Sequence, residues 1–277
     1  MIKAQAYCNV RIYRFKKGDR SKRELVQKVH NLVLNTGLNQ IRDALNGAAW
    51  HLGAVGLGSN GTAVQATDTW GLTPLICEAP TSSYYKNALF RATFLLEEGD
   101  LNGNTLREFW IAPSTTVGTA YSRVVFDPIA KTDDYAYLFI IDCTWGGACT
   151  RNAWFMLAAL AGSGGAYYYQ LNQLMCGRGT TLPTVYDETL ADPWTMSPIP
   201  VASSVTAVGE LTLRFTINPD QFNDEIMREA GLYFSCISGS SPITAPALYC
   251  RNLIDPAYAI EVGKGAQVVC VLKWESG

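Results

Sequence analysis

The feature that most constrains this chain is a set of short motifs that occurs twice in the same order. Leu106-Arg107-Glu108 in the first half is matched by Met227-Arg228-Glu229 in the second. Farther along, Tyr121-Ser122-Arg123 is matched by Tyr249-Cys250-Arg251. A repeat of this kind predicts a tandem duplication of one structural unit, and such molecules are more often building blocks of assemblies than catalysts.

Single positions around these motifs repeat as well. Each half has a Gly ten residues before an Asp, then an Asp-Pro pair and a closing Trp. In the first half these are Gly58, Asp68, Asp127-Pro128 and Trp145, and in the second half they are Gly177, Asp187, Asp255-Pro256 and Trp274. The spacing between matched residues grows from 119 (68 to 187) to 129 (145 to 274). Small loop insertions account for that drift. The sequence predicts the boundary between the two repeated units near Gly146-Gly147.

The composition favours strands over helices. Apolar residues make up 48% of the chain and charged residues 17%, which indicates a folded protein, and the 24 Gly suggest many turns. Alternating apolar residues predict strands at 51–57, 88–97, 105–112, 119–127 and 135–145, and at 166–175, 209–218, 226–236, 246–254 and 265–274. We therefore expect a mainly β protein with two tandem, pseudo-repeated β-sandwich-like domains, at 35–148 and 149–277.

A short helix is expected before each group of strands. Asn35 or Thr36 is a suitable cap for the first helix, and Gly47 a suitable end. The matching segment in the second half is Asn152–Leu160.

The N-terminal segment 1–34 is a basic arm or strand. Residues 1–30 carry nine Lys and Arg against Asp19 and Glu24, a balance of +7, so the rest of the chain is −9 for a total of −2. Ser21 and Glu24 have the spacing of a helix capping box, while 30–34 reads equally well as a strand. A basic arm could bind nucleic acid or an acidic neighbouring subunit. A solvated hairpin turn explains the charge better than nucleic-acid binding does, since the arm has few aromatic residues to stack on bases.

The repeated charges suggest buried ion pairs. Adjacent strand residues face opposite sides, so one residue of each Arg-Glu motif should point inward and need a partner. We predict that Glu108 pairs with Arg123 and that Glu229 pairs with Arg251. The alternative is that these residues are surface charges at a subunit contact. The full set of structural or interaction candidates is Arg107, Glu108, Arg123, Asp127, Arg228, Glu229, Arg251 and Asp255.

Eight cysteines leave two interpretations open. They are small buried apolar residues, or they form disulfides in a particle that works outside the cell. The candidates are Cys8, Cys77, Cys143, Cys149, Cys176, Cys236, Cys250 and Cys270. No C-x-x-C pair and only two histidines occur, so a zinc site is not expected.

Signals for enzymes and membranes are weak. Residues 56–61 match G-x-G-x-x-G, but a helix is poorly supported after them and the second copy breaks the pattern, so we interpret this glycine-rich segment as a turn between strands. Neighbouring carboxylates such as Glu97-Glu98 read as solvated turns. We expect no catalytic residues, no cofactor and no metal. No stretch is apolar and long enough for a membrane span, and the N-terminus lacks an export signal.

Six segments form an ordered set that covers about residues 31–145: Asn31–Leu38, Val55–Thr62, Asp68-Thr69, Gly103–Phe109, Tyr121–Ile129 and Lys131-Thr132. In their order and spacing they resemble virion proteins of tailed bacteriophages. The resemblance implies a structural protein of the tail, baseplate or fibre attachment region, located in the virion and assembled in the host cytoplasm. Its partners would be other virion proteins and itself. The second copy keeps Arg228-Glu229 but lacks the Asn-Thr-Gly start.

Two other functions stay open at this level. Capsid decoration, neck and collar proteins are β-rich as well, so they are alternative positions in the particle. Fourteen Tyr and seven Trp would suit a receptor- or glycan-binding module, with Tyr84-Tyr85 and Tyr167–Tyr169 as its aromatic residues. The favoured alternative is that these tyrosines lie in the strand core or at a subunit contact. A hydrolase would need a carboxylate pair in a cleft, which a sequence does not display.

Overall fold

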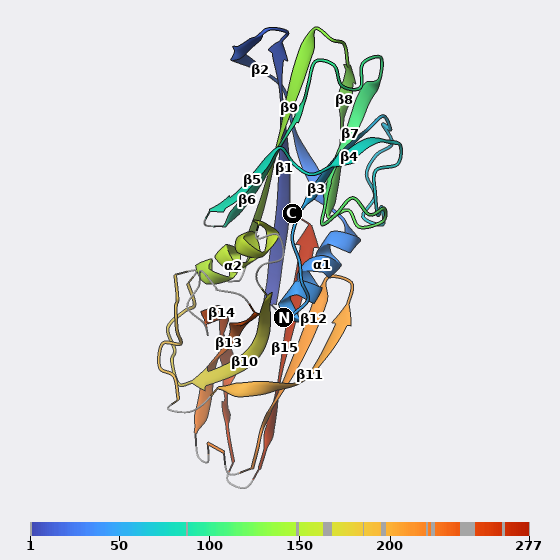
Figure 1. The fold of residues 1–277 in the computed structure, drawn as a ribbon. Helices are drawn as coiled ribbons and strands as arrows, with labels where there is room; N and C mark the ends of the chain where they lie inside the picture. The colour runs from blue at the N-terminus through green and yellow to red at the C-terminus, as the bar shows by residue number, and fades with distance from the viewer. Residues whose placement is uncertain are drawn as a thin grey trace.

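In the computed structural model, the chain is mainly β, with two helices. The structure describes residues 2–86, 88–147, 150–162, 168–184, 186–194, 198–219, 221–222, 225–238, 247–261 and 264–276. Figure 1 shows two groups of strands, one above and one below, with both helices between them. The strands belong to one large mixed sheet network.

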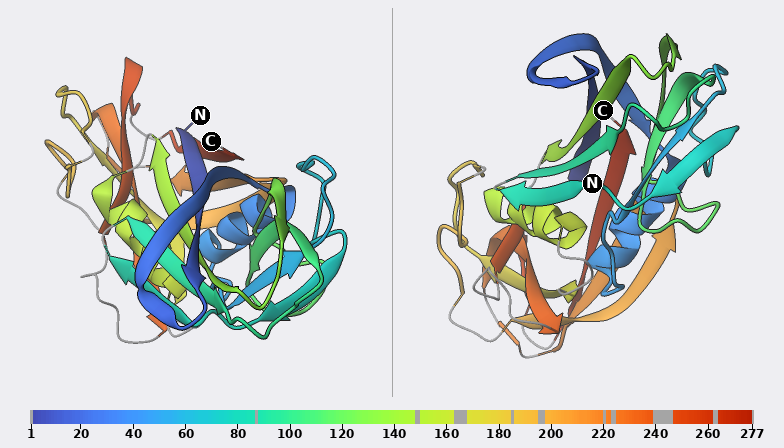
Figure 2. Two further views of the ribbon diagram at one scale, coloured as in Figure 1. Left: turned by 90° about the horizontal axis from the view of Figure 1, so that it is seen from above. Right: turned by 45° about the horizontal axis from the view of Figure 1, so that its top comes forward.

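The chain begins with a long hairpin of β1 (Ile2–Lys16) and β2 (Asp19–Val33), whose turn lies at one end of the molecule (Figures 1 and 2). Ser21 and Glu24 lie inside β2, so the expected capping box is wrong. Every second residue of β1 from Ala4 to Ile12 is buried. This segment is a strand because β2 pairs antiparallel with β1, whose alternating residues bury one face in the core.

The strands of the first half form two antiparallel sets. β3 pairs with β4 and β7, and β7 pairs with β8; separately, β6 lies between β5 and β9. Their bounds are β3 Ala54–Gly58, β4 Pro74–Glu78, β5 Ser82–Lys86, β6 Leu89–Leu96, β7 Thr105–Ala112, β8 Ser122–Ala130 and β9 Tyr135–Gly147.

The second half has the same kind of pairing. β13 lies between β10 and β14, and β12 lies between β11 and β15. Their bounds are β10 Tyr168–Gly177, β11 Ile199–Ala207, β12 Glu210–Ile217, β13 Ile226–Ser238, β14 Ala247–Ala259 and β15 Ala266–Ser276. Each strand expected from the sequence is present within a few residues of its predicted bounds. No strand was predicted at β4, β5 or β11, because these segments show no clear alternation of apolar and polar residues.

Strand β1 joins the two halves. Along one edge it pairs antiparallel with β9, from Ala4 opposite Gly147 to Lys16 opposite Tyr135. Along the other edge its first residues pair parallel with β15, and from Cys8 onward it pairs with β2. The last strands of both halves therefore share β1 as a neighbour.

Both helices follow strands and pack against the core. α1 (Asn35–Leu45) buries Leu38, Ile41 and Leu45, as its spacing predicts. Its N-cap is Leu34, with no side-chain cap hydrogen bond, so the predicted cap at Asn35 or Thr36 is wrong. The Thr36 hydroxyl instead donates to the Ala120 carbonyl at 2.5 Å. Tertiary contact thus takes the group that would otherwise cap the helix.

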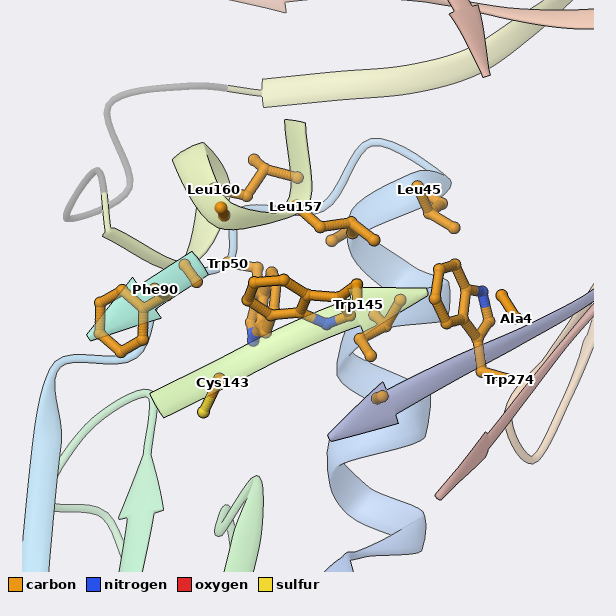
Figure 3. Close-up of a cluster of buried hydrophobic side chains, with 14 of the residues drawn as sticks. Ala4, Leu45, Trp50, Phe90, Cys143, Trp145, Leu157, Leu160 and Trp274 are labelled. Atoms are coloured by element: carbon orange, nitrogen blue, oxygen red, sulfur yellow. The ribbon is translucent and has the colours of Figure 1, made fainter. Parts of the chain in front are cut away.

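α2 (Arg151–Gly162) is more apolar and is buried over most of its length. Figure 3 shows Trp145 between α2 and the strands, with Leu157 and Leu160 above it. The Trp145 ring meets Trp50 edge to face, with 6.1 Å between centroids. Trp274 at the end of β15 belongs to the same buried cluster as Trp145, so the core is continuous between the halves.

The glycine-rich segment 56–61 lies partly in a strand and partly in the loop that follows it. Gly56 and Gly58 lie in β3, and neither has a positive φ. A Cβ at Gly56 would lie 2.1 Å from the Trp110 ring, and one at Gly58 would lie 2.2 Å from a Glu108 carboxylate oxygen. Close packing therefore requires these two glycines, so the predicted turn is wrong at Gly56 and Gly58, while residues 59–61 lie between β3 and β4.

Candidate functional site: two repeated arginine networks

Arg123 is at the centre of a buried charge network in the first half. It lies on β8 and is fully buried. Its Nε donates to Glu108 Oε2 at 2.8 Å, and its Nη1 donates to Asp68 Oδ2 at 2.8 Å. Nη2 donates to the Thr62 carbonyl at 3.3 Å. One guanidinium thus connects two strands to the loop 59–73.

Glu108 completes the attachment of this loop. Its carboxylate is fully buried and accepts the backbone N–H groups of Leu72 at 3.0 Å and Thr73 at 2.8 Å. Asp68 Oδ2 also accepts the N–H of Gln65 at 3.0 Å. Every oxygen in these contacts accepts from a cation or an amide, which is the condition for burying a carboxylate at acceptable cost.

Arg251 makes the same contacts in the second half. Its Nε donates to Glu229 Oε2 at 2.6 Å, and its Nη1 donates to Asp187 Oδ2 at 2.8 Å. Its Nη2 donates to the carbonyl of Thr181 at 2.7 Å. The atoms used are those that Arg123 uses, so the loop 178–192 is attached in the same way.

Glu229 also accepts amide hydrogen bonds from its loop. The donors are the N–H groups of Gly179 at 3.1 Å, Ala191 at 3.1 Å and Asp192 at 2.8 Å. Burial acts to raise the pKa of Glu229, but the Asp192 amide and Arg251 outweigh it and hold that pKa below its usual value. Glu229 is therefore held as a carboxylate.

The pKa values of Asp187 and Arg251 are also shifted in the direction that favours their charged forms. Burial acts to raise the pKa of Asp187, but the Thr184 amide and Arg251 lower it below its usual value. Burial acts to lower the pKa of Arg251, and the carboxylates of Asp187 and Glu229 raise it above its usual value. The charged forms of all three groups stabilise one another.

The strand register brings Glu and Arg together. Glu108 lies opposite Val125, so Arg123 is its diagonal neighbour on β8. Glu229 lies opposite Leu253, which makes Arg251 its diagonal neighbour on β14. Diagonal side chains on one sheet face are within reach of long residues. The two ion pairs predicted from the repeated motifs are thus present.

The remaining candidates lie elsewhere. Arg107 and Arg228 are exposed, as the alternation of each strand requires. Asp127 is exposed, and its backbone N–H and carbonyl are hydrogen-bonded to the side chain of Gln27. The side chain of Asp255 lies outside the described part of the structure.

The sequence revealed Asp68 and Asp187 as repeated positions without showing their role. Both residues lie in loops, and a sequence does not show how close those loops come to β8 and β14. Thr62 and Thr181 were missed altogether, because they contribute backbone carbonyls, and any residue type has one. Their constant spacing of 119 (62 to 181) was the signal available.

Six cysteines have described side chains, and all six are thiols: Cys8, Cys77, Cys143, Cys176, Cys250 and Cys270. Cys8 and Cys143 are buried and lie directly opposite each other on β1 and β9, with 2.6 Å between their Sγ atoms. Burial raises the pKa of Cys176 to about 12 and that of Cys270 to about 11. Cys149 and the side chain of Cys236 lie outside the described residues.

The described residues contain neither a cluster suited to a metal ion nor a helix suited to a membrane span. No three His, Cys, Asp or Glu side chains among them gather where they could hold a metal ion. No described helix has the length and apolar character needed to cross a membrane.

Comparison with protein-family models, with curated proteins and with solved structures finds no match to this chain.

Proposed function

We propose that this chain is a non-enzymatic structural component of a tailed-phage virion, where it mediates contacts between subunits of a symmetric assembly. The tail, baseplate or fibre attachment region is the position that the sequence resemblance favours. The observation that carries the proposal is the repeated arginine network, which fixes one loop in each half. A rigid scaffold presenting fixed loops is suited to binding neighbouring subunits.

The proposal includes two tandem, pseudo-repeated β-sandwich-like units. Strand pairing supports it, since β3–β7–β8 and β5–β6–β9 correspond in order and direction to β10–β13–β14 and β11–β12–β15. Hydrogen bonds before the helices support it too. The Leu34 N–H donates to the Tyr121 carbonyl at 3.0 Å, and the Thr150 N–H to the Tyr249 carbonyl at 2.9 Å.

A structural role suits the chemistry of these charges. Glu108, Arg123 and Glu229 are buried, and their polar atoms bind each other or loop amides. A catalytic acid or base has to reach a substrate. Buried charges that are already hydrogen-bonded to each other and to a loop stabilise that loop and do not contact a substrate.

The test is whether the protein is part of the particle. Phage particles are purified on a density gradient from a lysate of cells that produce them, and their proteins are quantified by mass spectrometry. We expect this chain in the particle band at a fixed ratio to the major capsid protein. Immunogold labelling then distinguishes the tail from the head, neck or collar. Recovery only among the free proteins at the top of the gradient would overturn the proposal.

A further inference from the structure

A basic groove lies on the outer face of the first half, away from both arginine networks. It has a volume of about 440 Å³ and crosses β2, β1, β9 and β6. Its charged lining residues are Arg11, Lys28, Arg91 and Asp142, and the lining also includes His30 and the apolar side chain of Leu89. The opposite face of these strands is the buried core.

Strand register builds the groove from distant segments. His30 on β2 lies opposite Asn9 on β1, Asn9 opposite Asp142 on β9, and Asp142 opposite Arg91 on β6. The next row places Lys28 opposite Arg11. Cross-strand neighbours on one face have side chains about 5 Å apart, so the side chains of these two rows form one continuous surface.

The groove has more positive than negative charge. Asp142 accepts hydrogen bonds from both Arg11, at 2.6 Å, and Arg91, at 2.5 and 2.9 Å. One carboxylate thus neutralises one of two guanidinium groups, and each guanidinium keeps N–H donors that Asp142 does not use. Lys28 is exposed and adds a further positive charge. The groove can therefore accept another carboxylate.

An exposed acidic loop lies in the second half, within residues 178–192. Its Leu182 and Tyr186 side chains are 79% and 75% exposed. Glu188 and Asp192 are also exposed, and neither forms an ion pair with a described residue. Unpaired carboxylates beside exposed apolar side chains are typical of a contact surface.

The groove and this acidic loop belong to different parts of the molecule. In Figure 1 the loop is the yellow trace at the left of the lower part, and the hairpin strand β2 is at the top. The Arg251 network holds the loop against β13 and β14. A contact between groove and loop is therefore a contact between two copies of the chain. The opposite net charges of residues 1–30 (+7) and of the remaining residues (−9) favour such a contact.

We propose that the basic groove of one copy binds the acidic loop of a second copy, with Glu188 against Lys28 and the unused N–H groups of Arg11 and Arg91. This inference rests on the proposed structural function and names its partner. Because groove and loop are different surfaces, the contact is head-to-tail, and successive copies form a ring or a filament.

The experiment is sedimentation velocity of the full chain over a range of protein and salt concentrations. We expect association that weakens as salt increases. Lys28→Glu and Glu188→Lys should each weaken it about tenfold or more, because each places like charges together. The double variant Lys28→Glu/Glu188→Lys should associate more strongly than Glu188→Lys alone, since it recovers one contact between opposite charges while Arg11 and Arg91 still face the reversed charge.

Two matched controls separate this contact from general charge attraction. Lys22→Glu reverses another exposed lysine of β2, and Glu261→Lys reverses an exposed glutamate outside the loop. Both should associate like the wild type, and thermal melts should show that all variants fold. A wild type that stays monomeric, a Lys22→Glu variant as weak as Lys28→Glu, or a double variant no stronger than Glu188→Lys alone would each overturn the inference. A monomer that still enters particles would overturn self-docking alone and leave the virion role standing.

Discussion

At the scale of residues, each network depends on one arginine that satisfies two carboxylates. Removing one partner of a buried pair leaves an unpaired charge, which costs about 3–5 kcal/mol. The energies of the two partners should be strongly coupled for the same reason.

Glu108→Ala and Arg123→Ala, made singly and together, test this coupling. We expect Arg123→Ala to lower the free energy of unfolding by about 3–5 kcal/mol, and the double variant to lose much less than the sum of the two single variants. Urea unfolding measures all three. Arg228→Ala, an exposed strand residue, is the control and should change stability by less than about 0.5 kcal/mol. Additive losses would contradict the pairing.

Acid should weaken the second network. The pKa values of Glu229 and Asp187 are lowered in the folded chain, so they stabilise it fully above their unfolded pKa values, about 4, and this stability is lost as pH falls through the folded values. Urea unfolding at pH 7, 5, 4 and 3 should show a steeper loss for the wild type than for Glu229→Gln. Glu188→Gln, an exposed glutamate, should follow the wild type. Parallel curves for wild type and Glu229→Gln would refute this expectation.

Cys8 and Cys143 should form a disulfide when the chain refolds with oxidised glutathione. Two thiols then become one cystine, and one glutathione disulfide becomes two glutathione thiols. Burial raises the pKa of Cys143, so the folded thiols should react slowly. Mass spectrometry of peptides after alkylation measures the link. Refolded Cys143→Ser should keep Cys8 alkylatable, and free thiols at both positions in refolded wild type would argue against the pair.

At the scale of elements, two glycines make room for the glutamates that attach the loops. A Cβ at Gly58 would lie 2.2 Å from Glu108 Oε1, and one at Gly177 would lie 2.6 Å from Glu229 Oε1. Neither glycine has a positive φ, so an added methyl group acts through space alone. This explains why Gly precedes each repeated Asp by the same distance.

Gly58→Ala should therefore displace Glu108 and loosen the loop 59–73. We expect a loss of about 1–3 kcal/mol in unfolding free energy. Hydrogen exchange of the Leu72 and Thr73 amides should become faster, because Glu108 accepts both. Gly99→Ala is the control, since a Cβ there meets nothing within 4 Å. Unchanged exchange at Leu72 and Thr73 would show that Glu108 does not need this space.

At the scale of the whole molecule, β1 couples the halves. Its residues Ala4 to Ala6 pair with β9 on one edge and with β15 on the other. One buried cluster includes Trp145 and Trp274. The halves should therefore unfold together, even though each has its own loop network.

Calorimetry of the wild type should give one unfolding transition with equal calorimetric and van't Hoff enthalpies. A variant lacking residues 2–6 loses the pairs between β1 and β15, so we expect two separated transitions at lower temperatures. Replacing residues 19–23, the exposed first residues of β2, with Gly and Ser is the matched control and should keep one transition. Two transitions in the wild type would mean that the halves are independent.

The sequence by itself determined the local features of this protein. Alternation placed the strands, and helical spacing placed α1, because both patterns record which face of an element is buried. The repeated motifs also predicted Glu108 with Arg123 and Glu229 with Arg251, since an inward charge needs a partner. These inferences succeed because they depend on neighbours along one strand or on a charge that has to be satisfied.

Only the tertiary structure decided which distant segments meet. It placed β1 between β9 and β15, made Gly56 and Gly58 packing sites instead of turns, and brought Asp68 and Asp187 to the arginines. It also aligned His30, Asp142 and Arg91 in one row across separate strands. Contacts of this kind depend on strand register over long separations, and a single sequence carries no local signal for register between distant strands.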